Sequence, residues 1–106
     1  MIFAIDFDGV IHDYKNIPEG RKLGAPIEGA KEALEFLRSE RHKIIIFSTW
    51  ASEDKVKTFE NWLNYFEIPF DEITNIKQKA HFYIDDHGLR FSSWNDTLLQ
   101  INKLIS

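Results

Sequence analysis

The chain of 106 residues contains no cysteine, which excludes disulfide bonds, thiolate metal sites and a cysteine nucleophile. It also lacks a basic excess, because 13 lysines and arginines stand against 17 aspartates and glutamates, for a formal net charge of −4. Without a basic run, tight binding to duplex nucleic acid is not expected. No apolar run approaches the ~20 residues of a membrane helix, and the first is too short for a signal peptide. These absences predict a soluble cytoplasmic protein.

Only five glycines and three prolines interrupt a chain that is 43% apolar and 14% aromatic. This composition is typical of a folded globular protein and not of a disordered segment. At this length we expect one domain over residues 1–106, large enough for a hydrophobic core but small for an enzyme.

Short apolar runs alternate with helical patterns along the chain. The predicted strands are residues 2–5, 44–47, a weak one near 70–73, and 81–84. Helical spacing relates Ile27, Ala30, Leu34 and Leu37, then Val56, Phe59, Leu63 and Phe66, and finally Trp94, Leu98, Ile101 and Ile105. We expect Ser52 to cap the second of these helices. Strands that alternate with helices predict an α/β fold with a mostly parallel sheet of about four strands.

Two aspartates, Asp6 and Asp8, follow the first apolar run. Ionised carboxylates are costly in the middle of a buried strand, but ligands of open parallel sheets bind at the carboxyl ends of the strands. If the strand end stays regular, both side chains point the same way. Such a pair suits a hard cation such as Mg2+ and nucleophilic or acid–base chemistry. The alternative is an acidic turn with only a structural role.

Two more predicted strands end in polar residues at the same edge. Ser48-Thr49 follows the second strand and Asp85-Asp86 ends the fourth, with Lys77 and Lys79 just upstream. A hydroxyl there can bind a phosphate oxygen or simply cap the next helix. Four carboxylates gathered at one edge repel each other, since one like-charge pair at ~4 Å costs on the order of 4 kcal/mol at an effective dielectric constant near 20. The arrangement therefore predicts both a divalent cation and a nearby lysine.

In their order along the chain, these residues resemble the four motifs of the haloacid dehalogenase superfamily. Residues 6–10 (Asp-Phe-Asp-Gly-Val) are similar to the first motif, Ser48 to the second, Lys77 to the third and Asp85-Asp86 to the fourth. Lys79 is the alternative to Lys77, and Thr49 the alternative to Ser48. The resemblance implies a Rossmann-like domain of three layers, with helices on both faces of the sheet.

The activity implied by this resemblance is that of a Mg2+-dependent phosphatase, which hydrolyses a phosphomonoester through an aspartyl-phosphate intermediate. Asp6 would be the nucleophile, and Asp8 would protonate the leaving oxygen and then activate water. Ser48 and Lys77 would bind the phosphoryl oxygens. The implied Mg2+ ligands are Asp6, the backbone carbonyl of Asp8, Asp85 and, in support, Asp86. The second aspartate of the first motif favours a phosphatase over a dehalogenase.

The spacing of the motifs leaves no room for the cap domain that many members of this superfamily carry. A capless member has an open site, which suits a large phosphorylated substrate unless oligomerisation closes it. The long polar loop of residues 9–24, which we call the flap, would then determine specificity. Its candidate contacts with the substrate are Tyr14, Lys15, Arg21 and Lys22.

Other interpretations remain open. A non-catalytic module that binds phosphate or metal could use the same fold, whereas a two-component receiver fits badly, because the lysine precedes the last acidic pair. His12 could touch substrate or be a solvated loop residue, and Trp50 could stack on substrate or pack. Of the other histidines, His87 is a candidate to support the adjacent aspartate pair, while His42 and His81 are interpreted as structural. The histidines lack the spacing of a zinc site.

Overall fold

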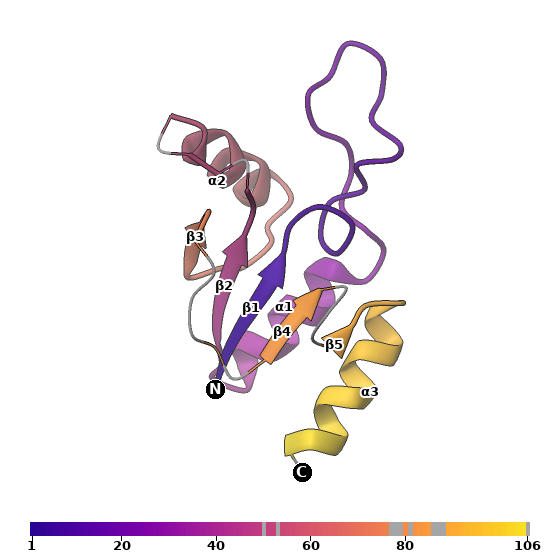
Figure 1. Ribbon diagram of the computed structural model, residues 1–106. Coiled ribbons are helices and arrows are strands. Elements are labelled where there is room, and N and C mark those ends of the chain that lie inside the picture. The colour runs from indigo at the N-terminus through magenta and orange to yellow at the C-terminus, as the bar shows by residue number, and fades with distance from the viewer. Residues whose placement is uncertain (50, 53, 77–79, 81, 86–88, 106) are drawn as a thin grey trace.

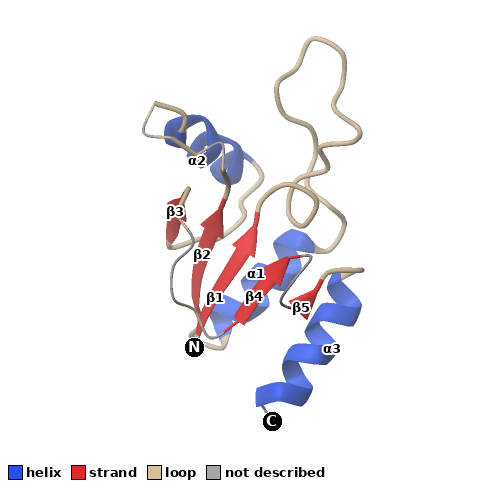
Figure 2. Cartoon of the chain, in the orientation of Figure 1, coloured by secondary structure: helices blue, strands red, loops and turns tan. Residues whose placement is uncertain are grey.

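A computed structural model of the chain describes residues 1–49, 51–52, 54–76, 80, 82–85 and 89–105. Within this part, three helices accompany a sheet of five strands (Figures 1 and 2). The strands are β1 (Ile2–Asp6), β2 (Lys43–Phe47), β3 (Glu72–Thr74), β4 (Phe82–Asp85) and β5 (Leu89–Arg90). The helices are α1 (Ala30–Ser39), α2 (Val56–Tyr65) and α3 (Trp94–Ile105).

All neighbouring strands pair in parallel, in the order β3-β2-β1-β4-β5. The α/β class with a parallel sheet is thus confirmed, with one strand more than the four expected. The order places β1 at the centre, where the chain first builds one side of the sheet and then crosses to the other. Such a switch point is where ligands of open α/β sheets bind. Two-component receivers have the order 2-1-3-4-5 instead, so the topology excludes that interpretation.

The largest group of buried apolar side chains lies on one face of the sheet, while Ala4 and Ile45, at 6% and 2% exposed, are buried on the other. The strand register aligns Phe3 with Ile44, and Ile5 with both Ile46 and Ile84, and these five side chains are at most 1% exposed. They form a single cluster with buried residues of α1, α2 and α3. All three helices therefore pack around this cluster.

Helices α2 and α3 begin at the first residues of their apolar patterns, Val56 and Trp94, whereas α1 begins at Ala30, three residues after Ile27. Gly29 precedes α1 with φ +86°, and a Cβ there would lie 3.3 Å from Trp94 Cβ, so the starts of α1 and α3 are in close contact. The helix expected after Ser52 begins only at Val56. The Ser52 hydroxyl bonds the Asp54 carboxylate at 2.6 Å instead, and this bond lowers the pKa of Asp54.

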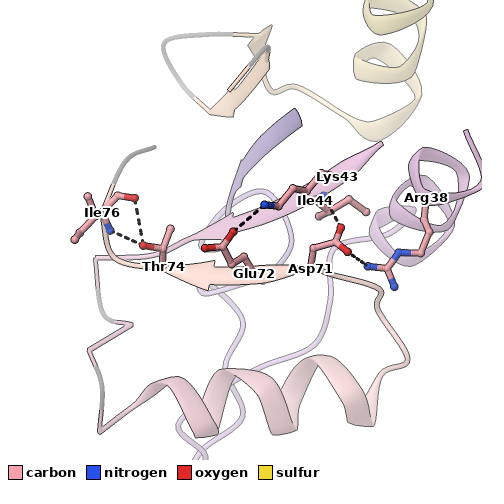
Figure 3. Close-up of polar contacts among 7 residues, drawn as sticks. All are labelled: Arg38, Lys43, Ile44, Asp71, Glu72, Thr74 and Ile76. Atoms are coloured by element: carbon pink, nitrogen blue, oxygen red, sulfur yellow. Dashed lines mark hydrogen bonds and ion pairs between the residues drawn. The ribbon is translucent and has the colours of Figure 1, made fainter. Parts of the chain in front are cut away.

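A polar cluster fixes β3 against β2 (Figure 3). The Asp71 carboxylate accepts hydrogen bonds from Ile44 N at 2.8 Å and from Arg38 Nη2 at 3.0 Å. Glu72 pairs with Lys43 at 3.3 Å. At the other end of β3, the Thr74 carbonyl accepts a hydrogen bond from Ser48 N at 3.0 Å. The edge strand thereby holds the backbone of a predicted site residue.

No helix in the described part of the chain is long and apolar enough to cross a membrane.

Candidate active site

The two aspartates of the first motif lie where β1 gives way to a tight turn. Phe7 N donates to the Phe47 carbonyl at 2.9 Å, so the parallel ladder extends one residue past Asp6. The Phe7 side chain is 1% exposed and belongs to the core. The chain then turns at Gly9, which has φ +81°. Asp6 and Asp8 lie on either side of the bend at Phe7, and both line the hollows at the carboxyl edge of the sheet.

A small hollow brings the second motif to the first. It has a volume of about 160 Å³ and is lined by Asp6, Phe7, Asp8, Phe47, Ser48 and Thr49. Ser48 is 5% exposed, whereas Thr49 is exposed. The Ser48 carbonyl also accepts a hydrogen bond from Ala51 N at 3.1 Å. Both candidate hydroxyl residues therefore lie beside the aspartates, with Ser48 in the more fixed position.

A larger hollow, of about 380 Å³, opens between the aspartates and the flap. Asp6 and Asp8 line it as well, so the two hollows share the acidic pair. From the flap, Asp13, Tyr14 and Lys15 contribute to its lining. Figure 1 shows the flap rising beyond the carboxyl ends of the strands.

The flap residues predicted to contact substrate divide into two groups. Tyr14 and Lys15 line the larger hollow, with the Lys15 ammonium 6.0 Å from the centre of the Tyr14 ring. Lys22 instead lines a different hollow, beside Lys55 and Phe59, and Arg21 is exposed. Substrate contact from this loop is therefore expected at Tyr14 and Lys15 first.

The third and fourth motifs are only partly within the described residues. Ile84 pairs with Ile5, and β4 ends at Asp85, so the backbone of Asp85 follows that register to the edge occupied by Asp6. The side chain of Asp85 lies outside the description, as do Lys77, Lys79, Asp86 and Trp50. His81 and His87 lie outside it too.

The donor chemistry at this edge fits Mg2+. Asp6 and Asp8 offer carboxylate and carbonyl oxygens beside the same hollows, and Mg2+ prefers oxygen ligands, usually one or two carboxylates together with waters. Among the residues described, no group of three histidines or carboxylates is close enough to hold a metal. The other two predicted ligands, Asp85 and Asp86, have side chains outside the described residues.

The structure assigns His12 a place that the sequence left open. Its side chain is 1% exposed, so it is no solvated loop residue. Nδ1 lies 2.8 Å from Asp8 Oδ1, and Nε2 accepts a hydrogen bond from Gly24 N at 2.8 Å. One sequence signal was available, namely the spacing of four residues from Asp8 to His12 across a glycine turn. That spacing alone does not show whether the His12 ring points into the protein or toward solvent.

Comparison with known proteins gives a structural relative but no family. No family model matches the chain, and no curated protein matches it. A similar solved structure is that of a conserved protein from Bacteroides thetaiotaomicron. The two chains are 25% identical with a TM-score of 0.76, and the match covers 100% of this chain and 93% of the other. This likeness supports the small parallel α/β fold.

Trp62 of α2 is expected to contribute strongly to stability, because it holds the end of the flap. Its Nε1 donates to the Gly24 carbonyl at 2.9 Å, and its ring meets Phe7 edge-on at 5.1 Å. Trp62→Phe leaves that buried carbonyl without its donor, so we expect a loss of about 1–3 kcal/mol in the free energy of unfolding. Denaturant titration measures it, with Tyr65→Phe on the exposed side of α2 as the control. Equal stability of the two variants would contradict the assigned role of Trp62.

Proposed function

We propose that this protein is a Mg2+-dependent phosphatase of the haloacid dehalogenase superfamily. The observation that carries the proposal is the meeting of Asp6, Asp8 and Ser48 around one hollow. This hollow lies at the carboxyl end of the central strand, at the switch point of the sheet. The order of the four motifs in the sequence supports the same conclusion.

In the proposed first half-reaction, a carboxylate oxygen of Asp6 attacks the phosphorus of a bound phosphomonoester. The ester P–O bond breaks as the new bond to Asp6 forms. Asp8 begins protonated and gives its proton to the leaving oxygen, which departs as an alcohol. The products of this step are the alcohol, aspartyl-phosphate at residue 6 and an ionised Asp8.

In the second half-reaction, a water molecule attacks the phosphorus of the aspartyl-phosphate. Asp8 now accepts a proton from that water, and the bond between phosphorus and Asp6 breaks. Inorganic phosphate leaves, Asp6 returns as a carboxylate and Asp8 is again protonated. The cycle thus needs no reactant besides the ester and water.

Binding groups and positioning supply the rest of the proposed rate enhancement. The Ser48 hydroxyl and the Lys77 ammonium would donate to phosphoryl oxygens, which is the usual form of catalysis in phosphoryl transfer. Mg2+, when bound by Asp6, the Asp8 carbonyl and Asp85 with Asp86 in support, would neutralise charge on the phosphoryl group. Tyr14 and Lys15 would contact the leaving group from the flap.

The open hollow suits a range of leaving groups, so the test uses a panel of chemically diverse phosphomonoesters. The panel contains nucleotides, sugar phosphates, phosphopeptides and phosphorylated nucleic-acid ends, each assayed for phosphate release with Mg2+ and with chelator. Metal-dependent release from at least one class is the expected result. If folded protein that binds Mg2+ releases phosphate from no ester of the panel, the proposal is overturned and a non-catalytic binding module is favoured.

Removing the Ser48 hydroxyl is expected to weaken binding of the phosphoryl group in the transition state. One hydrogen bond to a charged partner contributes about 1.5–3 kcal/mol, so Ser48→Ala should lower kcat/KM by roughly tenfold to a hundredfold. Thr49→Ala is the matched variant, since both residues line the same hollow. The larger loss is expected at Ser48, whose position is more fixed. The reverse order would assign the second motif to Thr49.

A further inference from the structure

The buried ring of His12 joins two parts of the candidate site that are separate in the sequence. One ring nitrogen contacts the carboxylate of Asp8, and the other contacts the backbone of Gly24, where the flap returns to the body of the protein. We propose that His12 is a positioning residue, which holds Asp8 Oδ1 so that Oδ2 exchanges protons with the substrate. This inference rests on the proposed phosphatase function.

The two contacts determine which nitrogen carries the proton. A backbone N–H can only donate, so the 2.8 Å bond from Gly24 N makes Nε2 an acceptor without a proton. In the neutral ring the proton then resides on Nδ1. Nδ1–H therefore donates to Asp8 Oδ1 across 2.8 Å. Because His12 holds Oδ1 of Asp8, the other oxygen, Oδ2, is the one that exchanges protons with the substrate in this proposal.

Packing prevents the ring from turning away from Asp8. The His12 ring stacks on Phe7, with centroids 4.9 Å apart and planes at 14°, and meets the edge of Trp62 at 5.5 Å. Both neighbours belong to the hydrophobic core. A ring fixed on two sides and bonded at both nitrogens can orient a carboxylate that is itself partly exposed.

The second contact of His12 is equally constrained, because Gly24 is held on both sides of its peptide backbone. Its N–H donates to His12 and its carbonyl accepts from Trp62 Nε1. A Cβ at this position would lie 2.9 Å from the Asp13 carbonyl oxygen, so a larger residue would displace the backbone. The same ring therefore orients Asp8 and ties down the end of the flap.

Two amide variants separate these tasks. The Asn amide nitrogen reaches about as far as Nδ1, so His12→Asn can keep the donor to Asp8 while losing the bond to Gly24. The longer Gln side chain reaches about as far as Nε2, so His12→Gln can keep an acceptor for Gly24 while losing the donor. Each is assayed with an alkyl phosphate, whose leaving oxygen needs a proton, and with p-nitrophenyl phosphate, whose leaving group needs one much less.

For His12→Gln we expect kcat/KM on the alkyl phosphate to fall by roughly a hundredfold, since general acid catalysis contributes about 10²–10⁴-fold. Its kcat/KM on p-nitrophenyl phosphate should fall far less, because kcat/KM covers only the steps up to departure of the leaving group, and Asp8 acts as a base on water only after that. His12→Asn should lose much less of its alkyl phosphate rate and should raise KM, because the flap is released. Equal losses for both variants on both substrates would reduce His12 to a structural residue and overturn the inference.

A measurement independent of turnover separates this inference from the proposed function. In wild-type protein with 15N-labelled histidine, NMR should show His12 protonated at Nδ1 and not at Nε2, and Asp8→Ala should shift the Nδ1 signal. A proton on Nε2 would overturn the positioning role whatever the activity. If the tautomer is as assigned but no ester is hydrolysed, the proposed function fails, and the catalytic part of the inference fails with it.

Discussion

Asp6→Asn is expected to lower the rate of phosphate release by at least about a thousandfold, as the loss of a covalent nucleophile does in other enzymes. The amide has nearly the shape of the carboxylate but cannot form the aspartyl-phosphate. The change should not unfold the protein, because it removes one of the negative charges gathered at the edge of the sheet. Phosphate release at saturating substrate measures the effect, and the melting temperature checks the fold.

The matched control for this variant is Asp96→Asn. Asp96 lies near the start of α3, where it is exposed and accepts a hydrogen bond from the Ser92 hydroxyl at 2.9 Å, so the same chemical change occurs away from both hollows. We expect its activity to stay within a few-fold of wild type. An Asp6→Asn protein with full activity would eliminate the aspartyl-phosphate mechanism, whatever the other variants do.

Removing Mg2+ is the second change with a large expected effect. Chelation should abolish turnover and lower the melting temperature, because the clustered carboxylates then repel each other without compensation. A ligand at 100 times its dissociation constant stabilises a folded protein by about 2.7 kcal/mol. For a domain of this size that corresponds to a melting shift of roughly ten degrees or more. Thermal melts with Mg2+ and with chelator provide the measurement.

Variants of the fourth motif test the ligand assignment behind that shift. Asp85→Asn should weaken Mg2+ binding more than Asp86→Asn, since the backbone of Asp85 ends the strand beside β1. Calorimetric titration of the two proteins compares their affinities directly. A melting temperature indifferent to saturating Mg2+ would argue against a preformed metal site, and stronger dependence on Asp86 would reverse the assignment.

Features governed by short-range alternation were predictable from the sequence. The apolar run before Asp6 predicted a strand with two aspartates at its carboxyl end, and the structure has β1 end at Asp6. Ser48 likewise follows directly on β2. In both places the sequence changes from apolar to polar residues at the end of a strand. Because the strands are parallel, these polar residues then lie at the same edge of the sheet.

Features that depend on contacts between distant residues were not predictable. The ring of His12 is buried because Gly24, Phe7 and Trp62 surround it, and no local pattern encodes that meeting. Strand β5 is only two residues long, which is too short for any periodicity. The roles of Lys77 and Asp86 stay predictions.

The two hydrogen bonds that hold the backbone of Gly24 also determine where the flap can accept changes in sequence and length. Its bonds to His12 and Trp62 close the flap at its base, while a Cβ at Gly20 would meet nothing within 4 Å. The entropy lost in closing a loop grows only slowly with length, at about 0.6 kcal/mol for each doubling. Residues can therefore be inserted or exchanged near Gly20 with little change in the free energy of unfolding. If the proposed function holds, changes at this position would alter substrate preference without disturbing the fold.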